Sequence, residues 1–217
     1  MGTITRNFAN NLTTSGVLLP ASLTNNSIAN VTAYNASVAT GNMVLISSQT
    51  ASDSASISFT TGIDSTYKEY QFYFINVAPR TDDVTFHFNG STDGGSNYNV
   101  TKTTTWFRAR HYEDDTEATL SYDNGNDLAQ STSFQPIHTG SGNGADENGV
   151  GILQLFNPSS TTYVKHFISV NNYNHAADIS INPFVAGYFN TTSAINAVQF
   201  KMASGNFDGT ILMYGIK

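Results

Sequence analysis

Cysteine is absent from this chain of 217 residues. Without thiols, the chain forms no disulfide, no thiolate metal site and no cysteine nucleophile. Charged residues are also scarce, at 12% of the sequence, which is about half of the usual share. The nine basic residues are scattered among 16 acidic ones, and the formal net charge is −7. Nucleic acid is therefore not expected as a partner, because binding to it relies on clustered Lys and Arg side chains that contact phosphates.

Long apolar stretches and helical spacing are missing as well. No 18 consecutive apolar residues occur, so we expect neither a transmembrane helix nor a membrane partner. Residues 1–7 lack the basic region and apolar run of a secretory signal. Apolar residues do not recur at helical spacing over any ten residues. The abundant Ser, Thr and Asn favour turns over helices, and Thr, Val, Ile, Phe and Tyr suit strands, so the composition predicts an all-β protein.

Residues 1–42 differ from the rest of the chain. Their apolar residues are isolated among polar ones at irregular spacing, so this segment cannot bury enough surface to fold alone. One interpretation is a disordered tail. We favour an extended N-terminal arm that anchors the protein on a neighbouring subunit, because apolar residues recur along its whole length. The residues expected to make that contact are Phe8, Leu12, Val17, Leu18, Leu19, Leu23 and Ile28.

From residue 43 onward, the apolar spacing changes to a period of two, which indicates strands. Strands are expected near residues 43–47, 55–60, 67–77, 84–88, 101–112, 117–122, 131–138, 150–157, 162–171, 179–190, 195–202 and 210–216. Segment 67–77 is apolar on both faces and predicts a central strand that is covered on both sides. With no crossover helices, the sheets should be antiparallel. We predict an antiparallel, jelly-roll-like β-sandwich of roughly 8–10 strands over residues 43–217.

Catalytic and metal-binding motifs are weak. The five histidines show neither HxH nor HExxH spacing, and no G-x-S-x-G elbow occurs. Residues 123–127, with the sequence Asp-Asn-Gly-Asn-Asp, carry oxygen ligands around a glycine as calcium loops do, but lack the later Glu of an EF-hand. The same residues also form ordinary turns. We predict no enzyme activity, metal or cofactor, and leave a weak calcium site at 123–127 as an open alternative.

Three aromatic residues of the middle region form a candidate glycan-binding site. Tyr98, Trp106 and Tyr112 could stack on sugar rings if they are exposed. The competing interpretation is that Trp106, the single tryptophan of the chain, belongs to the core of the sandwich.

Several stretches have a familiar pattern. They are residues 4–11, 49–59, 67–70, 155–162, 186–188 and 209–216. The chain resembles, over nearly its whole length, small structural proteins of marine tailed phages, including cyanophages. The final stretch, an apolar strand that closes on Tyr-Gly-Ile, is the most specific part of the resemblance. It implies a place in a virion and supplies no catalytic residues to transfer.

Together these observations predict a structural protein on the exterior of a tailed-phage virion. The resemblance implies a homo-oligomer, most simply a trimer, that contacts capsid or tail proteins. Capsid decoration and a tail-fibre or tail-associated role both fit. The alternative is a carbohydrate-binding module that adsorbs to host surface glycans. A polysaccharide depolymerase ranks last, because it needs paired carboxylates in a groove.

Overall fold

The computed structural model describes residues 12–13, 16–17 and 42–217. The chain divides into two units, Met1–Asn42 and Met43–Lys217. In the first unit, strands β1 (Leu12–Thr13) and β2 (Gly16–Val17) pair antiparallel, with Leu12 opposite Val17. The other expected contact residues of the arm lie outside the described residues, namely Phe8, Leu18, Leu19, Leu23 and Ile28.

The second unit is built of twelve antiparallel strands. Their bounds are β3 (Met43–Ser54), β4 (Ile57–Phe59), β5 (Glu69–Pro79), β6 (Val84–Ser91), β7 (Lys102–Tyr112), β8 (Ala118–Tyr122), β9 (Gln135–Ser141), β10 (Gly149–Phe156), β11 (Lys165–His175), β12 (Ile179–Phe189), β13 (Ala197–Met202) and β14 (Phe207–Ile216). The predicted all-β antiparallel sandwich is confirmed, with twelve strands where the sandwich was predicted to have roughly 8–10. Among the described residues, no helix has the length and hydropathy needed to span a bilayer.

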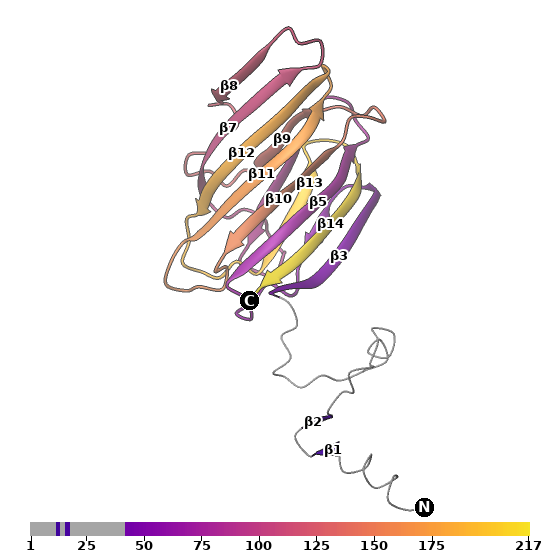
Figure 1. Ribbon diagram of the computed structural model, residues 1–217. Coiled ribbons are helices and arrows are strands. Elements are labelled where there is room, and N and C mark those ends of the chain that lie inside the picture. The colour runs from indigo at the N-terminus through magenta and orange to yellow at the C-terminus, as the bar shows by residue number, and fades with distance from the viewer. Residues whose placement is uncertain (1–11, 14–15, 18–41) are drawn as a thin grey trace, which may run out of the picture. The chain divides into compact units, whose positions relative to one another are not determined.

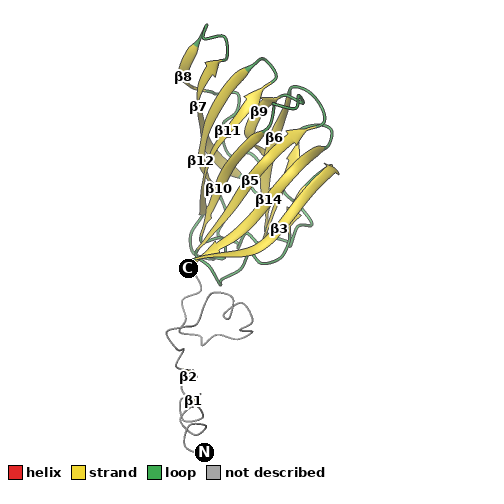
Figure 2. Cartoon of the chain, turned by 45° about the vertical axis from the view of Figure 1, so that its right-hand side comes forward, coloured by secondary structure: helices red, strands yellow, loops and turns green. Residues whose placement is uncertain are grey.

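The strands form two layers (Figures 1 and 2). We call the larger layer the wide sheet; its order is β8-β7-β12-β11-β10-β5-β14-β3. The narrow sheet has the order β9-β6-β13-β4 and lies behind the wide sheet in Figure 1. The two layers join where His175 of β11 pairs with Ser141 of β9. Eight strands therefore lie over four, and each sheet turns one face toward the other.

The core between the layers is centred on the ring of Phe200 in β13. Its centroid lies 5.2 to 6.3 Å from those of five other phenylalanines, Phe59, Phe72, Phe74, Phe86 and Phe88. Phe72 and Phe74 belong to the wide sheet, and the other three belong to the narrow one. Because alternate residues of a strand share a face, the period-two pattern of β5 turns Phe72 and Phe74 inward together. Phe200 is thus the side chain through which the two layers pack.

Removal of the Phe200 ring should destabilise the folded domain. We expect Phe200→Ala to lower the free energy of unfolding by about 3–5 kcal/mol, because the cavity left among five rings cannot collapse fully. Urea denaturation monitored by circular dichroism measures the change. As a control, Tyr163→Ala, at a side chain that is 70% exposed, should change it by less than about 0.5 kcal/mol. Equal effects of the two substitutions would contradict the central role of Phe200.

Candidate functional site

The outward side of the wide sheet is the most unusual surface of the described protein. The sequence predicted that β5 is covered on both faces, and this expectation is wrong for the single chain. Phe72 and Phe74 are buried, but on the other side Ile75 is 41% exposed and Tyr73 is only partly buried. The reason is that, within residues 42–217, the narrow sheet is the only layer that packs on β5, and it covers one face of this strand.

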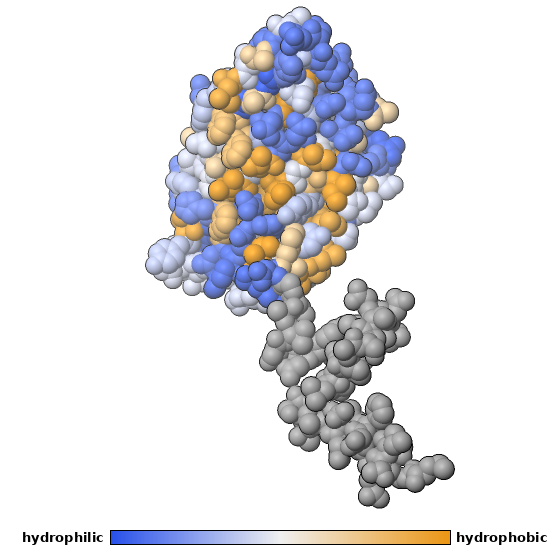
Figure 3. Space-filling model, in the orientation of Figure 1, coloured by the Kyte–Doolittle hydropathy of each residue, from blue (hydrophilic) through white to orange (hydrophobic). Residues whose placement is uncertain are grey.

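Strand register aligns the outward side chains in rows that cross the sheet. The first row contains one residue from each strand, Tyr122, Phe107, Phe184, Val170, Ile152, Tyr73, Leu212 and Ser48 in order from β8 to β3. The second row contains Thr105, Ala186, Ile168, Gln154, Gln71, Tyr214 and Leu45, in order from β7 to β3. We call these two rows the outer face. Figure 3 views this side and shows hydrophobic residues gathered over the middle of the sheet and toward β3.

The outer face carries no formal charge, although the chain has nine basic and 16 acidic residues. On β7, Arg108 and Arg110 alternate with Phe107, so their side chains leave the sheet on its other side. There they pair with Asp123, at 3.4 Å, and with Glu117. The two arginines and the exposed Phe107 therefore lie on opposite sides of the same strand, whereas His111, which pairs with Asp115 at 3.0 Å, ends the outward side.

Among the described residues, two carboxylates bind side chains of the outer face, namely Asp127, which accepts from the hydroxyl of Tyr122 at 2.6 Å, and Glu69, at the end of β5. The Oε1 atom of Glu69 accepts hydrogen bonds from Nε2 of Gln71 at 2.7 Å and from Nε2 of Gln154 at 3.0 Å. The hydroxyl of Tyr73 donates in turn to Oε1 of Gln71 at 3.0 Å. The polar side chains of Glu69, Gln71, Tyr73 and Gln154 are therefore hydrogen-bonded to one another.

Aromatic contacts fix the apolar side chains of the outer face. Phe107 and Phe184 stack with their ring centroids 5.3 Å apart and an interplanar angle of 12°. Tyr73 and Tyr214 meet edge to face at 5.5 Å. Despite these contacts, Tyr122 is 50% exposed and Phe107 is 39% exposed. Contiguous exposed apolar surface of this kind marks interaction sites in soluble proteins.

A depression of about 500 Å³ lies along the second row, over Thr105, Ala186 and Ile168. Ala186 forms its floor, because this small side chain stands between the larger Thr105 and Ile168 of the neighbouring strands. His166 and Tyr188, whose rings lie 5.7 Å apart, form part of its rim. The lining is mainly apolar, so the depression suits an apolar or aromatic group more than a charged one.

The three aromatic residues predicted as a glycan site do not come together. Trp106 is completely buried, so the core interpretation holds and its proposed role as an exposed stacking platform is wrong. Tyr112 ends β7 and packs against the buried cluster of Tyr173, Ile179 and Ile181. Tyr98 precedes the start of β7, so the length of this strand, about 33 Å, separates it from Tyr112.

The candidate calcium loop, residues 123–127, uses its two carboxylates internally. Asp123 accepts a hydrogen bond from the backbone of Gly125 and pairs with Arg108. Asp127 accepts a hydrogen bond of 2.6 Å from the hydroxyl of Tyr122. Within the part of the chain that the structure describes, no three His, Asp or Glu side chains converge as metal ligands would.

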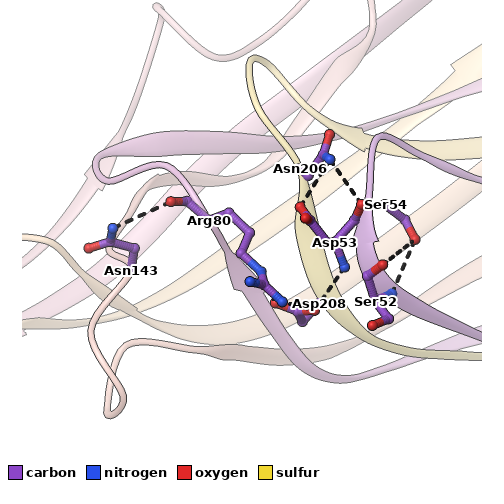
Figure 4. A network of polar contacts seen from close by, with 7 residues as sticks. All are labelled: Ser52, Asp53, Ser54, Arg80, Asn143, Asn206 and Asp208. Atoms are coloured by element: carbon purple, nitrogen blue, oxygen red, sulfur yellow. Dashed lines mark hydrogen bonds and ion pairs between the residues drawn. The ribbon is translucent and has the colours of Figure 1, made fainter.

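A polar network at one end of the sandwich binds three turns together (Figure 4). Arg80 binds Asp208 in a bidentate pair, with distances of 2.5 Å from Nε and 2.9 Å from Nη2. The backbone amide of Asp53 donates to the same carboxylate, and Asn206 binds Asp53. Arg80 lowers the pKa of Asp208. A polar pocket of about 480 Å³ adjoins this pair, but its two charged groups neutralise each other, so we assign the network a structural role.

Comparison of the chain with protein-family models, with curated proteins and with solved structures finds no match.

A buried polar group lies inside the sandwich, near the junction of the two layers. His138 is completely buried, stacks on Tyr173 at 4.8 Å, and has no hydrogen-bond partner for either ring nitrogen among the described residues. Gly149 leaves room for this ring, because a Cβ atom there would overlap it. Burial lowers the pKa of His138 to about 3 and, together with the charge of Lys201, lowers that of His87 to about 4.

These histidines make stability depend on pH. In the unfolded chain they bind a proton below about pH 6.5, whereas in the folded protein they do so only near pH 3 to 4. The unfolded state therefore binds more protons between these limits, and stability falls as the pH is lowered through them, by up to about 1.4 kcal/mol per pH unit for each histidine. Urea denaturation at a series of pH values should show this slope, and His138→Phe should reduce it. Phe200→Leu, which keeps both histidines, should lower stability without changing the slope. An unchanged slope in His138→Phe would refute this assignment.

Proposed function

We propose that this protein is a structural component of the exterior of a tailed-phage virion and that it acts by association with other subunits. The observation that carries the proposal is the outer face. It presents fifteen outward positions on eight strands without one formal charge, in a chain whose net charge is −7. A monomer gains nothing from such a surface, since exposed apolar area favours aggregation, whereas an assembling subunit needs it.

The other surfaces support an assembly role over catalysis. General acid–base chemistry needs titratable groups that face a shared space. Here the charged side chains of the polar pocket, Arg80 and Asp208, are paired with each other, and the described residues that line the depression over Ala186 include His166 and Tyr188 but no carboxylate. No observation favours the carbohydrate-binding alternative, because Trp106 is buried and Tyr98 and Tyr112 are far apart.

Within this proposal, residues 1–42 anchor the protein to capsid or tail proteins, and residues 43–217 form the folded, exposed domain. The protein assembles with copies of itself. A capsid-decoration role and a tail-associated role are both compatible with a domain of this size.

Antibody labelling of intact particles tests the location. Virions of a phage that encodes this chain are incubated with gold-labelled antibodies raised against the purified protein and are imaged by electron microscopy. We expect gold at one defined place on the particle exterior, capsid or tail. Antibodies preabsorbed with the purified protein are the control and should give no label. Absence of label, together with absence of the chain from the proteins of purified virions, would overturn the proposal.

A further inference from the structure

We propose that the outer face is covered by the outer face of a second copy of this chain, so that two wide sheets pack face to face. The inferred twofold axis lies in the contact plane and runs approximately along the strands, between β10 and β11. This inference deepens the proposed function and rests on it, because it names the contact through which the subunit associates with itself.

Part of each strand at the centre of the wide sheet is apolar on both faces. In β11, Ile168 and Val170 lie outward near buried Phe167, between the polar outward residues His166 and Asn172. In β10, Ile152 and Val150 lie opposite buried leucines. Apolar residues on both faces are typical of strands buried on both sides, whereas a solvated face carries polar residues. In the single chain these four side chains are open or only partly covered. A second layer on the outer face would complete the pattern.

The outward side of the wide sheet, with the outer face at its centre, is large enough for a stable dimer. Eight strands spaced by about 4.8 Å give a width of about 34 Å, and strands of this length rise about 30 Å. The whole outward side therefore covers about 1,000 Å², of which the two rows of the outer face make up about half. The area of the whole outward side exceeds the roughly 800 Å² that each partner buries in an interface of standard size. Two sheets that pack face to face keep their strands within about 30° of each other, so their rows of side chains stay in contact near the centre.

Charge favours an identical partner. Two copies, each with a net charge of −7, repel each other unless their charges stay away from the contact. The two rows of the outer face satisfy this condition, because they carry no formal charge and because Arg108 and Arg110 point away from them. The two carboxylates at their margins, Glu69 and Asp127, are each bound by side chains of the same copy. The outer face also offers no pattern of charge by which a partner of opposite sign would be selected.

The order of side chains along the first row is complementary to itself. A twofold axis between β10 and β11 sets Val170 against Ile152 of the second copy, and the remaining pairs become Phe184 with Tyr73, Phe107 with Leu212, and Tyr122 with Ser48. The largest side chain at one edge thus faces the smallest at the other. An axis in the contact plane but perpendicular to the strands would instead place each bulky residue against the identical residue of the second copy.

The second row fits the same axis. Thr105 lies second from the β8 edge of the wide sheet, and Tyr214 lies second from the β3 edge. The axis therefore brings Tyr214 of one copy against Thr105 of the other, beside Ala186. An aromatic ring there would occupy the apolar depression, which is otherwise open to solvent.

Charge placed at the centre of the outer face should dissociate the dimer. We expect the full chain to sediment as a dimer at micromolar concentration, and Val170→Lys and Ile152→Lys to raise the dissociation constant by roughly 100-fold or more, because each buries two unpaired ammonium groups. Thr85→Lys, at an outward position of the narrow sheet, is the matched control and should leave it unchanged. Circular dichroism confirms that each variant is folded. A monomeric wild type, a trimer, or a dimer insensitive to both central substitutions would overturn the inference.

Cross-linking tests which residues of the two copies face each other, and it leaves the apolar residues at the centre of the outer face unchanged. The chain has no cysteine, so a short bis-maleimide reacts only with introduced thiols. A mixture of the Ser48→Cys and Tyr122→Cys variants should give a covalent dimer, whereas either variant alone should not, because like positions lie about 34 Å apart across the face. Cross-linking within either variant alone, or none in the mixture, would overturn the proposed axis. If the chain is monomeric while virion labelling succeeds, the proposed function stands and the outer face is assigned to another virion protein.

Discussion

Packing of phenylalanine rings around Phe200 is the interaction on which the rest of the structure depends. This cluster takes side chains from both layers, and further ring contacts such as Phe88 with Phe167 extend it beyond Phe200, whereas backbone pairing joins the two sheets only between β11 and β9. Because the cluster occupies one side of each sheet, it also determines which residues are left on the other side. The exposed row from Tyr122 to Ser48 is therefore a direct consequence of how the core is filled.

The interior is not uniformly apolar, and its buried polar groups help to determine the register of the strands. Lys102 is completely buried, and its Nζ donates to the carbonyl oxygens of Val100 and Ser133. Burial lowers the pKa of this amine to about 7. Together with the unpartnered ring of His138, it places groups that favour solvent inside the protein. Such groups reduce stability, and they disfavour any alternative register in which they would lose the few contacts they have.

Much of the fold follows from local pattern, because the period-two spacing of apolar residues directly reflects the alternation of side chains across a strand. This is why β5, β7 and β11 are found close to where the sequence places them. The polar second half of β3, from Ser48 to Ser54, was not predicted, because an edge strand with few apolar residues carries little of this pattern. The outer face could not be predicted at all. Its rows join residues of eight strands whose neighbours are set by pairing, and Phe107 and Tyr73 become members of one row only once the strand order is known. The burial of Trp106 likewise depends on its partners in space and not on its neighbours in sequence.

The order of strands has a consequence for how the protein is made. β14, the last strand of the chain, lies between β3 and β5, which are among the first to be synthesised in the folded domain. The gap between β3 and β5 therefore stays open until β14 has been synthesised and has paired with both of them. Pairing across such long separations along the chain is slow, since the intervening loop must be ordered first. A chain that is terminated before β14 would lack an interior strand of the wide sheet and would leave β3 without its partner, instead of forming a shortened domain.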